Sequence, residues 1–89
     1  MSENKAATEI RKVYSTYRTL PGTNQYMMIS EIENRADLTR EQIREGILAL
    51  LGEPGFLVLP ESNQKALSPE ARAAAVNIGN QDKHLIAWV

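Results

Sequence analysis

Few residues of this chain have the chemistry of a catalytic or metal site. His84 is the only histidine, and there is no cysteine. A zinc site takes about three or four ligands from histidine, cysteine and carboxylate side chains, so an isolated histidine does not supply one. Three acids, Glu31, Glu33 and Asp37, lie close together in the sequence. Two of them fall at an expected helix start, where the helix dipole stabilises an acid without any catalytic role.

Sequence motifs of phosphate binding and of hydrolysis are also missing. The sequence has no glycine-rich phosphate loop, no G-x-S-x-G and no H-E-x-x-H. A chain of 89 residues has little room for a pocket that excludes water. We therefore expect a binding protein and not an enzyme, with no metal, no cofactor and no small-molecule substrate.

Composition bounds the class of protein. With 43% hydrophobic and 24% charged residues, the 89-residue chain has the make-up of one globular domain, expected over residues 1–89. The absence of cysteine fits a reducing compartment. No apolar run approaches the roughly 20 residues that cross a bilayer, and the first residues lack the apolar stretch of a signal peptide. We expect a cytoplasmic protein without a membrane partner.

The middle of the chain predicts two short helices joined by a turn. Ser30 and Glu33 have the S-x-x-E spacing of a capping box, ahead of a helix over about 31–36. Asp37 and Leu38 are expected to form the turn that follows. The pair of helices is predicted to occupy residues 30–51.

The second of these helices begins with a capping box of its own. Thr39 and Gln42 have the T-x-x-Q spacing. Gly46 is costly inside a helix, by about 1 kcal/mol relative to alanine, and predicts the close approach of another helix. Apolar residues at helical spacing form the expected buried stripe of this helix: Ile43, Ile47, Leu50 and Leu51.

A longer helix and a brief strand are expected before this pair. The helix should run over about 6–20 and stop at Pro21-Gly22. Its buried stripe would consist of Ile10, Val13, Tyr14, Tyr17 and Leu20. Residues 25–29 read as a short edge strand, in which one of two adjacent methionines, Met27 and Met28, should enter the core.

The last third of the chain predicts two strands with an insertion between them. The apolar segments 56–59 and 84–89 are expected to pair antiparallel. Ser68 and Pro69 have the types favoured at a helix start and predict a short helix over about 69–76. Residues 77–83 are expected to form a loop.

The order of these elements resembles the winged helix-turn-helix domain. The resemblance rests on the sequence of helix, brief strand, two capped helices and two strands, and it covers nearly the whole chain. It implies an α+β fold with three helices and a two- to three-stranded antiparallel sheet. The helix-turn-helix would span 30–51 and the wing region 56–89, with a short helix inserted in the wing.

The resemblance also implies sequence-specific binding of double-stranded DNA, as in a small transcriptional regulator. The helix that begins at Thr39 would lie in the major groove, where arginine can bond to guanine O6 and N7. Its assigned contact residues are Thr39, Arg40, Gln42 and Arg44, with Arg35, Asn63 and Lys65 expected near the DNA backbone. Such proteins commonly bind as homodimers, and the first helix, with Tyr14 and Tyr17, is the expected dimer element.

Charge leaves a second function open. Affinity for DNA comes largely from basic residues, and this chain has a net charge of −1 and a pI of about 5.8. Glu41 and Arg44, three apart, are expected to form a solvated surface pair. The alternative is a protein-interaction module of the same fold, or the first domain of a larger protein. Leu48 lies off the buried stripe and either packs under the wing or contacts a partner. In the protein-interaction alternative, the expected contact residues are Leu48, Met27, Tyr14 and Tyr17.

Overall fold

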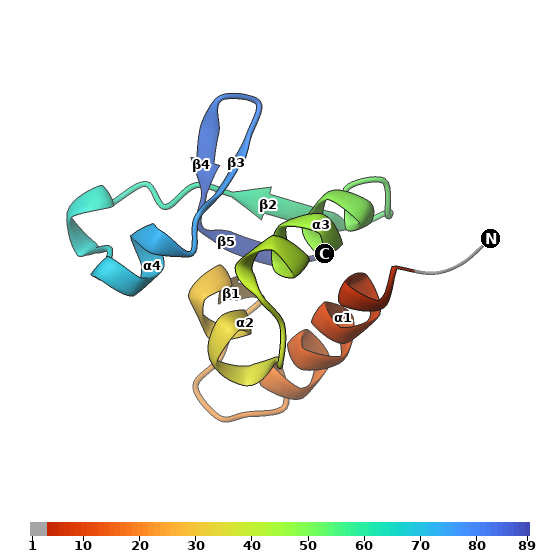
Figure 1. The fold of residues 1–89 in the computed structure, drawn as a ribbon. Coiled ribbons are helices and arrows are strands. Elements are labelled where there is room, and N and C mark those ends of the chain that lie inside the picture. The colour runs from red at the N-terminus through yellow and green to blue at the C-terminus, as the bar shows by residue number, and fades with distance from the viewer. Residues whose placement is uncertain (1–3) are drawn as a thin grey trace.

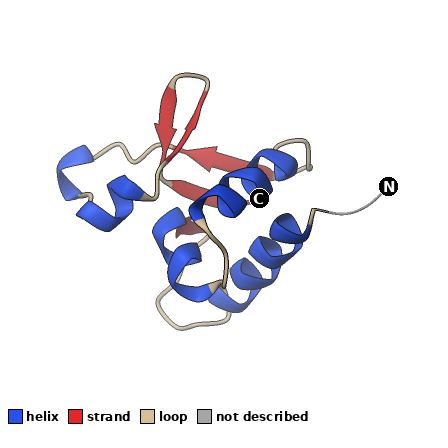
Figure 2. Ribbon diagram, viewed as in Figure 1, coloured by secondary structure: helices blue, strands red, loops and turns tan. Residues whose placement is uncertain are grey.

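The computed structural model describes residues 4–89 as an α+β fold. Its elements follow in this order: α1 (Lys5–Tyr17), β1 (Tyr26–Met28), α2 (Ile29–Arg35), α3 (Arg40–Leu50), β2 (Phe56–Leu59), the 3₁₀ helix η1 (Gln64–Ala66), α4 (Pro69–Ala73), β3 (Val76–Ile78), β4 (Gln81–Lys83) and β5 (Leu85–Trp88). The strands form a three-stranded sheet in the order β1-β5-β2 and a separate β3-β4 hairpin (Figures 1 and 2). The expected α+β class is confirmed. Within the described part of the chain, no helix has the length and apolar character that crossing a bilayer requires.

The three-stranded sheet places segments from distant parts of the chain side by side. Strand β5 lies in the centre and pairs antiparallel with β1 on one side and β2 on the other. The expected pairing of the segments 56–59 and 84–89 is therefore confirmed. Met27, Ile86 and Val58 form one cross-strand row, and this row packs into the hydrophobic core with residues of α1, α2 and α3.

Helices α1 and α3 approach each other closely at Gly46. A Cβ atom built at position 46 would lie 3.0 Å from the carbonyl carbon of Ala6 in α1 and 2.7 Å from the Cδ1 atom of Ile10. Gly46 therefore permits a contact between the two helices that a side chain would obstruct. The close approach expected from the sequence is confirmed.

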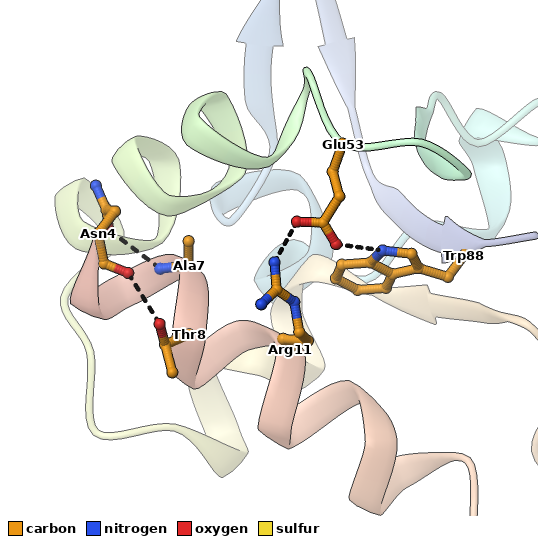
Figure 3. A network of polar contacts seen from close by, with 6 residues as sticks. All are labelled: Asn4, Ala7, Thr8, Arg11, Glu53 and Trp88. Atoms are coloured by element: carbon orange, nitrogen blue, oxygen red, sulfur yellow. Dashed lines mark hydrogen bonds and ion pairs between the residues drawn. The ribbon is translucent and has the colours of Figure 1, made fainter. Parts of the chain in front are cut away.

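Side-chain caps fix the starts of three helices. The amide of Ala7 donates to Asn4 Oδ1 at the start of α1, with a distance of 3.0 Å (Figure 3). At α3, both halves of the Thr39–Gln42 capping box are formed, as predicted. At α4, Ser68 accepts from the amide nitrogen of Ala71 at 3.1 Å, which confirms the predicted cap.

The predicted cap at Ser30 is wrong. Helix α2 begins two residues earlier than predicted, at Ile29, and its N-cap residue Met28 makes no side-chain cap bond. Strand β1 ends at Met28 and runs directly into α2, and the amide of Ile29 donates to the carbonyl oxygen of His84 at 2.9 Å. A backbone contact with a distant segment therefore satisfies the first amide of the helix. The inward positions Ile32 and Ala36 are buried.

Helix α1 ends earlier than predicted, at Tyr17 and not at Leu20. The hydroxyl of Thr19 donates to the Thr16 carbonyl oxygen at 2.6 Å, and the hydroxyl of Thr23 lies 2.9 Å from the carbonyl oxygen of Leu20. These side chains bond to carbonyl groups at the end of the helix and in the turn that follows it. Leu20 therefore leaves the buried stripe and is exposed.

The loop predicted for residues 77–83 is instead a hairpin, and α4 ends at Ala73, before the predicted limit of Val76. Gly79 and Asn80 at its tip both have positive φ, 61° and 63°, as a two-residue type I′ turn requires. The hairpin projects from the body of the molecule, above α4 in Figure 1. The insertion between β2 and β5 thus contains η1, α4 and a hairpin.

Glu53, in the turn between α3 and β2, links three parts of the fold (Figure 3). Its carboxylate pairs with Arg11 of α1 and accepts from the indole Nε1 of Trp88 in β5, the latter at 3.2 Å. The Trp88 ring packs against the rings of Tyr14 and Phe56, with centroid distances of 4.8 and 4.6 Å. This cluster holds the end of α3 in place.

Candidate binding surface of helix α3

Helix α3 buries one side and leaves the other in solvent. Ile43, Ile47 and Leu50 point inward and are at most 2% exposed, as predicted. The prediction that Leu51 completes the buried stripe is wrong, because Leu51 is the C-cap residue and 42% exposed. The position of α3 between α1 and the sheet therefore presents the opposite side of the helix to a partner.

Four residues form a line along this exposed side. Arg40, Arg44 and Leu48 are spaced four apart, and Leu51 follows three residues later, so all four lie on one side of the helix. We call these residues, Arg40, Arg44, Leu48 and Leu51, the α3 stripe. The arginine side chains are 62% and 49% exposed, and the leucines are 38% and 42% exposed. The stripe is cationic at the start of α3 and apolar at its end.

The cationic part of the α3 stripe is already paired with acids. Arg40 Nε lies 2.8 Å from a carboxylate oxygen of Glu33. Arg44 Nη1 lies 3.6 Å from Glu41 Oε1, which confirms the pair predicted from their spacing. The described surface around α2 and α3 is therefore mixed in charge and not continuously basic.

Thr39 and Gln42, which the resemblance assigned to DNA, are engaged in the helix start. Thr39 Oγ1 accepts from the amide of Gln42 at 3.1 Å, and Gln42 Oε1 accepts from the amide of Thr39 at 2.9 Å. The side-chain oxygens of both residues thus stabilise α3 itself.

Arg35, a further assigned DNA contact, lies at the end of α2. Its Nε lies 3.0 Å from Glu31 Oε2, and its Cζ lies 5.6 Å from the centroid of the Tyr17 ring. Arg35 also borders a shallow groove of about 320 Å³, whose other lining residues belong to α1: Glu9, Lys12, Val13 and Thr16. The Arg35 guanidinium therefore packs over the Tyr17 ring at the junction of α1 and α2.

Asn63 and Lys65, which the resemblance assigned to the DNA backbone, do not lie in a hairpin. Both are exposed, and they belong to the connection around η1 that leads from β2 to α4. Figure 1 shows η1 beyond α4 and well apart from α3. The projecting hairpin is β3-β4, so a partner that contacts α3 and a hairpin would meet residues near Gly79 and not Lys65.

Two of the predicted protein contacts are wrong because they are buried. Met27 is 0% exposed and is the methionine that enters the core. Tyr14 is 8% exposed, and its hydroxyl donates to the carbonyl oxygen of Gln25 at 2.7 Å. Tyr17 is half-buried beneath Arg35. Leu48 is 38% exposed, which favours partner contact over packing under the wing among the two alternatives that the sequence left open.

The sequence reasoning missed a second apolar surface, the face of the three-stranded sheet that points away from the helices. We call it the outer sheet face; its residues are Tyr26, Met28, Leu57, Leu59, Leu85 and Ala87. The available signal was the run of consecutive apolar residues in all three strands, which is typical of strands covered on both faces.

His84 has a structural role. The side chain is buried, and its Nδ1 accepts a hydrogen bond from the amide of Glu61 at 3.0 Å. Among residues 4–89, no group of three or more histidine, cysteine or carboxylate side chains is placed to hold a metal ion.

No protein-family model, curated protein or solved structure matches the chain.

Proposed function

We propose that this chain is a winged helix-turn-helix module that binds a partner protein through the α3 stripe. Two features support the fold named in this proposal. The chain runs α1, β1, α2, α3, β2 before the insertion, and the last strand, β5, lies between β1 and β2. This is the element order and strand pairing expected of that fold, with η1, α4 and the β3-β4 hairpin inserted between the last two strands.

The exposure of Leu48 and Leu51 beside neutralised arginines carries the functional part of the proposal. Each leucine leaves more than a third of its surface in solvent, and the two lie three residues apart on one side of α3. Burying a fully exposed leucine side chain contributes about 1.5–3 kcal/mol, so burying the 38% and 42% that remain exposed contributes about 1 kcal/mol for each leucine, whereas an exposed ion pair contributes about 0–1 kcal/mol. The apolar end of the stripe therefore offers more binding free energy than the cationic end.

The α3 stripe also indicates the chemistry of the partner surface. Protein interfaces have an apolar centre and a polar rim. Leu48 and Leu51 would occupy the centre, and Arg40 and Arg44 would lie at the rim, beside Glu33 and Glu41. We infer a partner with an apolar contact area flanked by polar groups of both charges.

Site-specific crosslinking tests this proposal. A photo-crosslinking residue at position 48 of the full chain should capture a partner, which is then purified and titrated against the wild type. Leu48→Glu should weaken the purified complex at least tenfold, because it buries an unpaired charge, while the thermal melt by circular dichroism stays unchanged. The matched control is Ala49→Glu, since Ala49 is exposed on another side of α3. Equal affinities for the wild type and Leu48→Glu would refute the proposal.

DNA binding is the second candidate function, favoured by the exposure of the two guanidinium groups at the start of α3. Arg40 and Arg44 are 62% and 49% exposed, and exposed pairs of this kind are weak enough to be exchanged for phosphate or guanine. Fluorescence anisotropy with random-sequence duplex DNA at rising salt separates the two functions. Salt-dependent binding that Arg44→Gln weakens and Leu48→Ala retains would establish DNA as the partner in place of a protein.

A further inference from the structure

Positive charge is concentrated on helix α1. Four of the ten basic residues lie between Lys5 and Arg18, and Glu9 is the single acid in that segment, which therefore has a net charge of +3. Residues 19–89 contain six basic and nine acidic residues, a net charge of −3. The charge of this protein is segregated along the chain, although its total of −1 is close to zero.

The basic residues of α1 lie on its solvent-facing side. One side of the helix packs into the core, and the cations lie on the other. Lys5 and Lys12, seven residues apart, share a row along the helix, and Arg11 and Arg18 repeat this spacing beside it. Helix α1 lies well apart from the β3-β4 hairpin (Figure 1). We call this side the outer face of α1; its residues are Lys5, Thr8, Arg11, Lys12, Ser15 and Arg18.

Three cations of the outer face of α1 are available to a partner. Lys5, Lys12 and Arg18 are exposed and form no ion pair within residues 4–89. Arg11, by contrast, pairs with Glu53. The outer face of α1 therefore differs from the α3 stripe, in which both arginines are paired with acids.

The side chains between the cations indicate the class of partner. The outer face of α1 contains no aliphatic and no aromatic residue. A protein interface has an apolar centre, a helix that binds a bilayer inserts apolar residues into it, and single-stranded nucleic acid stacks on aromatic rings. Contacts with the phosphates of a duplex need only cations and hydroxyl groups. The two remaining residues of this face, Thr8 and Ser15, carry hydroxyl groups.

We propose that the outer face of α1 binds the phosphate backbone of duplex nucleic acid without reading its base sequence. Lys5, Lys12 and Arg18 would each neutralise a phosphate and release its counterions. Exposed cations suffice for this contact, because the release of counterions supplies its free energy. The winged helix-turn-helix resemblance implies a different contact, in which α3 reads base edges in the major groove.

The acidic remainder of the chain orients this contact. Residues 19–89 have a net charge of −3, so they are repelled by the duplex and α1 faces it. The pI of about 5.8 does not oppose binding, because the basic residues gather on one side of one helix. Helix α3 packs against the other side of α1 at Gly46, so the outer face of α1 points away from α3. The two surfaces can therefore be tested separately.

Fluorescence anisotropy of the full chain with random-sequence DNA and RNA duplexes of equal length tests this proposal. We expect both duplexes to bind with a Kd of about 10–100 µM at about 50 mM salt, and log affinity to fall with log salt with a slope of about −3. Lys12→Gln should weaken binding several-fold and reduce the slope by about one, and Lys5→Gln should do the same. The matched control is Lys65→Gln, which removes the same charge from exposed η1 and should bind as the wild type does.

Four results would overturn the proposal. The first is no salt-dependent binding of either duplex at low salt. The second is an equal loss in Lys12→Gln and Lys65→Gln, because binding would then follow net charge alone. The third is a larger loss in Arg44→Gln than in Lys12→Gln, which would place the contact on α3. The fourth is displacement of the duplex by polyglutamate as effectively as by unlabelled duplex, which would make an acidic protein segment the partner.

The proposed protein contact of α3 stands or fails independently. Leu48→Ala removes the apolar side chain of the α3 stripe and leaves the outer face of α1 intact. This variant should bind both duplexes as the wild type does, whatever its effect on a protein partner.

Discussion

Gly46 of α3 lies so close to Ala6 of α1 that a Cβ atom at position 46 would come within 3.0 Å of both the carbonyl carbon and the Cβ of Ala6. The two helices therefore meet where one of them has no side chain. This contact sets the position of α3 against α1, and with it the direction in which the α3 stripe points. A substitution at Gly46 should consequently lower the free energy of unfolding, and any effect on partner binding should follow from that loss.

Replacing Gly46 with alanine should destabilise the fold. Alanine favours the helix by about 1 kcal/mol, but overpacking a tight contact costs about 1–3 kcal/mol, and the backbone atoms of Ala6 cannot move without shifting α1. We expect a net loss of about 1 kcal/mol in the free energy of unfolding, measured with urea and Trp88 fluorescence. Gly52→Ala is the control, since a Cβ there meets nothing within 4 Å. Equal stability of the two variants would show that α1 and α3 separate easily.

The two capping boxes predicted from the sequence give a paired test. Thr39→Ala removes an observed cap and should cost about 1 kcal/mol in unfolding free energy. Ser30→Ala should cost much less, because Ser30 lies inside α2 and does not cap it. Thermal unfolding of both variants measures the difference. A larger loss for Ser30→Ala would contradict the start of α2 at Ile29.

His84→Leu should destabilise the connection between β2 and the insertion. The substitution leaves the amide of Glu61 without the acceptor that Nδ1 provides, at a cost of about 1–3 kcal/mol in unfolding free energy. His84→Asn, which retains an acceptor on a short side chain, should recover part of this loss. Denaturant unfolding of the three proteins measures both effects. Full stability of His84→Leu would mean that water replaces the imidazole.

The tip of the β3-β4 hairpin should depend on the residue at position 80. Asn80 has a φ of 63°, and a left-handed conformation costs a β-branched residue about 1–2 kcal/mol more than it costs glycine. Asn80→Gly should therefore retain the hairpin, whereas Asn80→Val should loosen it. Amide exchange of β3 and β4 is the suitable measurement, because the hairpin can open without global unfolding. Equal protection in both variants would contradict the turn geometry.

The parts of the fold that could be predicted from sequence are those fixed by local signals. The Thr39 and Ser68 caps, the inward residues Ile43, Ile47 and Leu50 of α3 and the two apolar strands follow from residue type and spacing, and each is present. The start of α2 could not be predicted in this way, because the amide of Ile29 is satisfied by His84, more than fifty residues later in the chain. Local patterns do not contain such a contact.

The β3-β4 hairpin and the exposed residues of α3 were harder to predict from sequence, for different reasons. Gly79-Asn80 is a recognised two-residue turn pair, but the alternation before it covers only Val76–Ile78, and the strand after it, Gln81–Lys83, has no apolar residue. For the candidate site, the sequence placed Leu48 off the buried stripe but left its exposure open. It placed Leu51 in the core, although helical spacing puts Leu51 on the same side of α3 as Arg44 and Leu48, where it is 42% exposed.

The geometry of the hairpin tip has a practical consequence. Gly79 and Asn80 are exposed, a Cβ at Gly79 would meet nothing within 4 Å, and the tip projects away from the body of the molecule (Figure 1). A short peptide tag or a spin label grafted there would report on the tumbling and spacing of whole molecules while disturbing few neighbours. We also expect limited proteolysis to cleave the chain first at this hairpin tip.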